Sequence, residues 1–128
     1  MVLQRRENVI VMKADAFTDR IVKMYQFLTT NRYESIMTKQ ILRSGTSIGA
    51  NVAESINAQS TADFINKLNI ALKEADESHY WLKKLHTGGY LKDSEFESME
   101  KDVIEIIKLL TRIIKTKKRN TESLDSHK

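Results

Sequence analysis

The sequence predicts an all-α fold, an antiparallel up-and-down four-helix bundle. The chain of 128 residues has no proline and only four glycines, so few positions interrupt a helix. Apolar residues recur three and four residues apart through four long stretches, which short polar links separate. Amphipathic helices joined by short links pack as a bundle. We therefore expect residues 1–119 to form a single domain and residues 120–128 to be a disordered polar tail.

The first two predicted helices span about residues 8–30 and 33–56, and residues 31–32 form the turn between them. Asn8 can serve as an N-cap because its side-chain oxygen can accept a free backbone N–H. We expect residues 1–7 to be a loose arm. The core positions of the first helix keep one regular spacing: Ile10, Ala14, Phe17, Ile21, Met24 and Leu28.

The third predicted helix follows a cap at Ser60 or Thr61 and ends near Thr87. The glycines at 88–89 stop it, because a glycine after a helix adopts the left-handed conformation without steric cost. Its core positions are Phe64, Leu68, Ala71, Leu72, Ala75, Ser78 and Leu82.

The fourth predicted helix begins with a capping box formed by Ser94 and Glu97. In such a box, each of the two side chains accepts a hydrogen bond from a backbone N–H of the first turn. Its core positions are Phe96, Met99, Val103, Ile106, Ile107, Leu110 and Ile114.

The stretch from Arg43 to Ser55, in the second predicted helix, carries unusually few large side chains. Its apolar and small residues cover about half of the helix surface, so we expect neighbouring helices on two sides. Glycine costs about 1 kcal/mol relative to alanine inside a helix, so Gly45 and Gly49 indicate close approach of another helix. The two arcs consist of Met37, Ile41, Gly45, Ile48, Val52 and Ile56, and of Leu42, Thr46, Gly49 and Ala53.

Four segments are distinctive in their order along the chain: Arg43–Glu54, Asp63–Phe64, Ala71–Ala75 and Tyr80–Leu82. With them the chain resembles, over about residues 8–117, the four-helix-bundle family encoded by insertions in bacterial 23S ribosomal RNA genes. This family is called the S23 or intervening-sequence protein family. The resemblance implies a homo-oligomeric ring, often a pentamer, and similarity to the nucleic-acid-binding accessory protein of diversity-generating retroelements. It implies no established activity.

The composition argues against several kinds of site. The chain has no cysteine, which excludes a disulfide, a thiolate metal site and a cysteine nucleophile. His79 and His86 are two helical turns apart, about 10 Å, and cannot share a metal ion unaided. We expect each imidazole to be hydrogen-bonded to a neighbour, and we expect no metal, no cofactor and no small-molecule substrate.

Membrane insertion and export are not indicated. No apolar run approaches the roughly 20 residues that a membrane-spanning helix needs. The first residues lack the apolar core of a signal peptide, so we expect a cytoplasmic protein with no membrane partner.

One stripe of the third predicted helix lies opposite its core face and carries a tryptophan and an isoleucine. Large apolar side chains on an outer face mark an interface, so we predict contact with other subunits there. The predicted oligomer interface comprises Gly45, Gly49, Ala53, Ile70, Glu74, Glu77 and Trp81. The alternative is that Trp81 lies flat over the edge of its own bundle. Glu74 and Glu77 have no matching carboxylate pair on another helix, which argues against acid–base catalysis.

Ser47, Asn51 and Glu54 lie along one flank of the second predicted helix. No nucleophile elbow or phosphate-binding glycine loop accompanies them. We therefore predict a structural polar network that fixes helix register, since buried polar groups need hydrogen-bond partners.

The fourth predicted helix has opposite charges in its two halves. Residues 95–105 contain five acids and one lysine, whereas residues 106–119 contain six bases and no acid. The bases are tentative nucleic-acid-binding residues: Lys108, Arg112, Lys115, Lys117, Lys118 and Arg119. No aromatic residue lies among them, so base stacking is not indicated. A solvated basic helix end is the simpler alternative, because this charge order also suits the helix dipole.

Two functions are consistent with these features. The first is a non-enzymatic homo-oligomeric scaffold that binds RNA or DNA through a repeated basic surface, without sequence specificity. The alternative is a protein–protein adaptor whose ring presents a docking surface to a partner and binds no nucleic acid.

Overall fold

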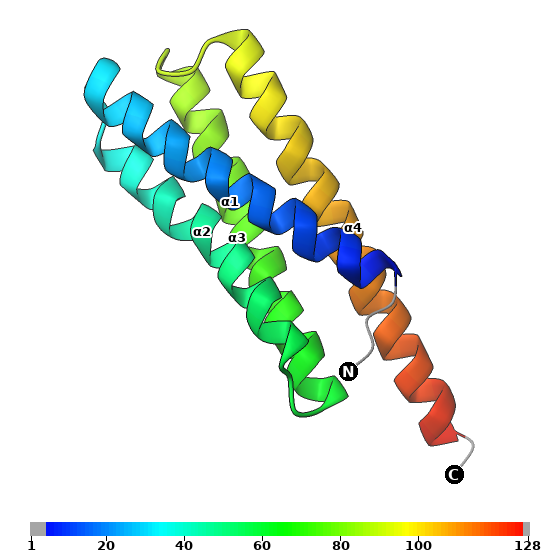
Figure 1. Cartoon of the computed structure of the whole chain (residues 1–128). Helices are drawn as coiled ribbons and strands as arrows, with labels where there is room; N and C mark the ends of the chain where they lie inside the picture. Colours follow the sequence, from blue (N-terminus) through cyan, green and yellow to red (C-terminus); the bar gives the residue numbers. More distant parts are fainter. Residues whose placement is uncertain (1–4, 127–128) are drawn as a thin grey trace.

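The computed structural model describes the backbone of residues 5–126 and the side chains of residues 7–123; residues 1–4 and 127–128 lie outside the described residues. Four helices and no strand occur in the described range (Figure 1): α1 Arg5–Asn31, α2 Ile36–Ile56, α3 Thr61–Thr87 and α4 Asp93–Ser126. The predicted all-α class with four helices is therefore confirmed.

Each helix packs against two others, so that α2 lies between α1 and α3, and α4 closes the bundle against α3 and α1 (Figure 1). Ion pairs show the register of α2 and α3. Arg43 near the middle of α2 pairs with Glu77, whereas Glu54 near the end of α2 pairs with Lys67.

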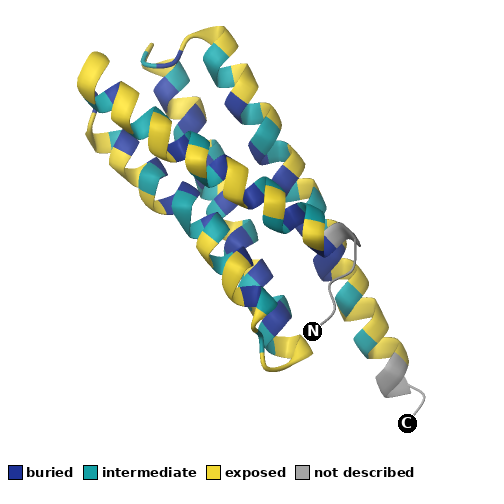
Figure 2. Ribbon diagram, viewed as in Figure 1, coloured by how far each residue is buried: buried dark blue, intermediate teal, exposed yellow. Residues whose placement is uncertain are grey.

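The core runs along the inner faces of all four helices, where Figure 2 shows the buried residues. The seam predicted for α1 is correct: five of its six residues are buried, and Met24 packs partly buried against them. Buried residues that the sequence prediction missed include Leu85, Leu91 and Ile113. The fully buried large side chains are Phe17, Ile10, Ile21, Leu28, Ile41, Ile48, Leu68, Leu82, Leu85, Ile106, Leu110 and Val52.

The two glycines of α2 lie against α1, which confirms the predicted close approach of a neighbouring helix. A Cβ atom added at Gly45 would lie 2.8 Å from Cγ1 and 2.9 Å from Cγ2 of Ile21. A Cβ atom added at Gly49 would overlap the hydroxyl of Thr18. On its other side α2 contacts α3, where the buried Ser78 hydroxyl donates to Ser44 Oγ over 2.9 Å. The two-sided covering of α2 is therefore confirmed.

The beginnings of α1 and α2 differ from the prediction. Helix α1 begins at Arg5, so Asn8 lies inside it and is not an N-cap. Helix α2 begins at Ile36 rather than Tyr33, because Tyr33 has a left-handed backbone with φ of +57°. The Glu34 carboxylate supplies the cap instead, accepting the N–H groups of Ile36 and Thr38 over 3.2 and 2.7 Å.

The ends of α3 agree with the prediction. Ser60 Oγ accepts the N–H of Asp63 over 3.0 Å, which confirms Ser60 as the N-cap. The helix ends at Thr87, and Gly89 has the left-handed φ of +80°.

The cap of α4 is displaced from its predicted place. The Lys92 N–H donates to Glu95 Oε1 over 2.8 Å, so the capping glutamate is Glu95 and the prediction of Ser94 and Glu97 is wrong. At the other end α4 continues to Ser126, past the ends of the other helices (Figure 1). Residues 120–126 are thus helical where we predicted a disordered tail. Residues 120–126 are mostly weak helix formers, so their helix follows from the packed segment before them, because extending a helix costs much less than nucleating one.

Arg32 fastens the end of α1 to the beginning of α4. Its guanidinium donates to both carboxylate oxygens of Glu95, over 2.6 and 3.0 Å, and to the carbonyl of Tyr90 over 2.7 Å. The hydrogen bond from Arg32 holds the pKa of the Glu95 carboxyl below its ordinary value. A bidentate arginine–carboxylate pair has the geometry in which an ion pair contributes most.

We expect Glu95→Gln to lower the free energy of unfolding by about 1 kcal/mol at pH 7, a value discounted because Glu95 is partly exposed. A carboxylate whose pKa is depressed by folding stabilises the protein above its unfolded pKa, about 4.3, and loses that contribution as the pH falls. The loss measured by urea unfolding should therefore shrink at pH 3. Glu97→Gln, at an exposed position of the same helix, is the control. An equal loss at both pH values would contradict this account.

Candidate nucleic-acid interface

The basic half of α4 forms an exposed surface. Five of its six predicted residues are exposed: Lys108, Arg112, Lys115, Lys118 and Arg119. Their helix is held in the bundle by Leu110, Ile113 and Ile114, which are buried on its opposite side. None of the five forms an ion pair with another described residue. We call these five residues the basic surface.

Lys117 differs from the other five basic residues. Its Nζ lies 3.0 Å from Oε1 of Glu7 and 5.3 Å from the centre of the Phe64 ring. Glu7 is only 4% exposed, although we predicted a loose arm there. Lys117 therefore joins α4 to α1 and α3. The sequence predicted a phosphate contact at this position, but the Lys117 side chain is engaged within the bundle.

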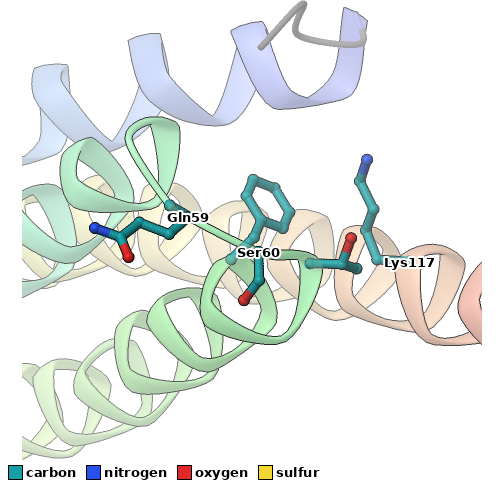
Figure 3. A pocket seen from close by; sticks show the side chains of 6 residues that line it. Gln59, Ser60 and Lys117 are labelled. Atoms are coloured by element: carbon teal, nitrogen blue, oxygen red, sulfur yellow. The ribbon is translucent and has the colours of Figure 1, made fainter.

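A hollow of about 220 Å³ lies beside Lys117, where the α2–α3 connection meets α4 (Figure 3). Its lining residues are Ala58, Gln59, Ser60, Thr61, Phe64 and Lys117. The two groups best suited to hold an anion already have partners. Lys117 extends toward α1 and Glu7, and Ser60 caps α3. The hollow is therefore a structural junction and not the centre of a site.

The acidic half of α4 is largely neutralised within the chain. Glu105 pairs with Lys13 over 2.6 Å, and Glu95 pairs with Arg32 over 2.6 Å. Asp102 pairs with Arg20 of α1. The acids of α4 thus bind neighbouring helices, whereas the basic surface faces solvent. The exposed charges of residues 95–119 that form no ion pair with another described residue are therefore mostly positive, and Glu97 is the exception.

Both described histidines join α3 to α4, as predicted for imidazoles hydrogen-bonded at the core edge. His79 Nε2 lies 2.8 Å from Glu100 Oε2, and His86 Nε2 lies 2.7 Å from Asp93 Oδ1. The His86 ring also stacks on Phe96, with 4.4 Å between ring centres. Within the described residues, no group of three or more His, Asp or Glu side chains is arranged to hold a metal ion.

The stripe of α3 that contains Trp81 is half-buried, whereas the sequence predicted that it faces outward. Arg43 of α2 reaches across to it and binds both Glu74 and Glu77. The Trp81 indole N–H donates to Glu77 Oε2 over 3.2 Å, and its ring packs against the core. The alternative, a tryptophan over the edge of its own bundle, describes this geometry better.

The other residues of the predicted oligomer interface divide into two groups. Gly45 is buried against α1, so the prediction that it lies at a subunit surface is wrong. Gly49 also contacts α1. Ala53 is exposed. Contact with another subunit along α2 and α3 stays a prediction for the exposed and half-buried residues.

The polar network predicted on α2 is present only in part. Asn51 Nδ2 donates to the Ser47 carbonyl over 2.8 Å and to Ser47 Oγ over 3.2 Å. Glu54 is exposed and instead pairs with Lys67 of α3 over 2.9 Å. The buried link between helices is Ser44–Ser78, which the predicted network did not include.

The fold and this surface define a class of protein, a four-helix all-α chain whose longest helix carries a basic C-terminal half. The model of the 23S rRNA-intervening sequence protein family matches residues 6–112, and the chain belongs to this family. No helix in the described range is both long enough and apolar enough to cross a membrane.

A solved structure supports the same assignment. The crystal structure of a protein of unknown function from the S23 ribosomal protein family of Bacteroides thetaiotaomicron is 55% identical to this chain. It superimposes with a TM-score of 0.85, over 86% of this chain and 98% of that one. Among proteins with curated descriptions, none matches.

Proposed function

We propose that this protein is a non-enzymatic, homo-oligomeric scaffold that contacts the phosphates of RNA or DNA through the basic surface of α4. The observation that carries the proposal is the group of five exposed cations without an ion-pair partner among the described residues. Lysine and arginine bind phosphates by charge and release condensed counterions, which needs no base contact. The family name, which refers to 23S rRNA, is in keeping with a nucleic-acid partner.

The absence of an enzymatic role is part of the same proposal. Histidine is the commonest acid–base group, and the two described histidines, His79 and His86, each bind a carboxylate that ties α3 to α4. The Glu74 and Glu77 carboxylates bind Arg43. These polar groups therefore have structural partners. We place the protein in the cytoplasm, where ribosomal RNA is found.

The salt dependence of binding tests the contact. We expect the affinity for a nucleic acid of mixed sequence to fall steeply with salt, by about 0.7–0.9 in log K per phosphate contacted for each tenfold rise in salt. Arg112→Gln with Lys115→Gln should reduce that slope by about two contacts for each subunit engaged. Folding should be almost unchanged because both side chains are exposed. Fluorescence anisotropy at several salt concentrations measures both quantities.

A matched control uses two exposed lysines at the opposite end of the bundle. Lys39 lies in the first turn of α2 and Lys83 near the end of α3. Lys39→Gln with Lys83→Gln removes the same charge and should leave the slope unchanged. Binding that persists in half-molar salt would point to another site.

An adaptor remains the second candidate, because apolar side chains are exposed where α1 turns into α2. Tyr33 is 87% exposed and Ile36 is 78% exposed. Exposed apolar groups that lie together mark interaction surfaces. If the protein binds no nucleic acid at low salt, the adaptor becomes the favoured function, and the partner that docks on this surface would be another protein.

A further inference from the structure

Four residues of the basic surface form a straight row along α4. Lys108, Arg112, Lys115 and Arg119 follow one another at intervals of four, three and four residues, and all four are exposed. Side chains at these intervals share one face of a helix, and a rise of about 1.5 Å per residue makes the row about 16 Å long. The helix backbone thus sets the spacing of the charges, so the row suits a ligand whose charges are also regularly spaced.

The length of the contact is limited on one side by the acidic half of α4. Glu97 is exposed on the N-terminal side of Lys108 and forms no ion pair with another described residue, whereas Glu105 pairs with Lys13. A carboxylate repels the phosphates of a nucleic acid. The contact is therefore confined to the row and comprises about three or four phosphates per subunit.

The segment that carries the row offers no aromatic ring on which an unpaired base could stack. Residues 106–123 contain no aromatic residue. Phe64, which lies beneath Lys117, is itself buried. Proteins that bind single strands without sequence preference gain about 1–3 kcal/mol for each base stacked on an aromatic ring. That contribution is missing here.

A double helix does not need that contribution, because its bases stack on one another. It also presents one negative charge per 1.7 Å of its axis, about twice the density of one of its strands. We infer that the row binds the sugar–phosphate backbone of a double helix in preference to a single strand. This inference rests on the proposed function and specifies its ligand. Duplex DNA and duplex RNA share this backbone chemistry, and the test treats them separately.

The test compares ligands of one length at one salt concentration. The whole protein is titrated against a 20-base-pair DNA duplex, a 20-base-pair RNA duplex and the single strands oligo-dT and oligo-U of 20 nucleotides. We expect at least one duplex to bind about tenfold more tightly than either single strand, with a slope of about 0.9 per contact against about 0.7. A preference between the duplexes supports the inference and identifies the nucleic acid.

Two variants locate the binding. Lys108→Gln with Arg119→Gln should weaken duplex binding at least tenfold in low salt, whereas Lys39→Gln with Lys83→Gln should not. Circular dichroism checks that both variants are folded. Single strands that bind as tightly as the duplexes would overturn the inference and leave the proposed function intact. Duplex binding that Lys108→Gln with Arg119→Gln does not change would overturn it as well. No binding of any ligand at low salt would overturn both.

Discussion

Replacing Gly45 by leucine is expected to lower the free energy of unfolding by about 3 kcal/mol. Even a single added carbon would lie 2.8 Å from Ile21 Cγ1 and 2.9 Å from Cγ2. Ile21 cannot turn away, because it branches at Cβ and is fully buried in the core. The helix propensity of leucine, about 0.8 kcal/mol better than glycine, offsets only part of this overlap. The midpoint of urea unfolding measures the loss.

Two further variants separate overlap from propensity. Ala50→Leu places the same side chain at an exposed position of α2 and should unfold like the parent. Gly49→Ala should be nearly neutral, because its added carbon meets only the Thr18 hydroxyl, which can rotate away. That rotation breaks the hydrogen bond from Thr18 Oγ1 to the Ala14 carbonyl, which costs about 1 kcal/mol of stability. The higher helix propensity of alanine than of glycine restores about the same amount. If Gly45→Leu unfolded like Ala50→Leu, the close approach of α1 to α2 would be wrong.

The sequence was sufficient for several features that depend on one helix at a time. The seam from Ile10 to Leu28 and the stop at Gly88 and Gly89 follow from local periodicity and backbone chemistry, and both agree with the structure. The glycines of α2 also predicted a close helix contact. They did not reveal whether the close helix belongs to the same chain, because a helical pattern gives directions around an axis and no partner. For that reason Gly45 was placed at a subunit interface.

Contacts between residues distant in sequence decided the rest. Lys117 meets Glu7 only because α1 and α4 lie side by side, a pairing over 110 residues that no local pattern contains. Trp81 is half-buried because Arg43 and α2 cover its stripe. The start of α2, in contrast, is a local feature that the prediction missed: the Glu34 side chain caps the helix after a left-handed Tyr33. A glutamate two residues before the apolar pair Ile36 and Met37 was the available signal.

If the protein is a ring, the basic surface is repeated, and binding to a long nucleic acid should be much tighter than to a short one. We predict a pentamer of 5 × 14.8 kDa, or about 74 kDa, by light scattering at micromolar concentration. Several weak phosphate contacts on one rigid assembly act together, which raises affinity by about 10²–10⁴ over a single subunit. A mass of 14.8 kDa would rule out the oligomer, and another multiple would correct only its number of subunits.

We therefore expect a monomeric variant to bind a 60-base-pair duplex about 100-fold or more weakly than the parent while keeping every basic residue. Trp81→Gln is one such variant, but Trp81 also packs against the core, so a loss there could reflect unfolding. Ala53→Gln is the second. Ala53 is exposed, so the glutamine adds a larger side chain to the predicted subunit surface without removing a contact in the core. For a 10-base-pair duplex, which is about 34 Å long and offers far fewer phosphates to the repeated surface, the difference between parent and monomer should be much smaller. Equal affinity for the long duplex in both would place the whole binding energy in one subunit and contradict the role of repetition.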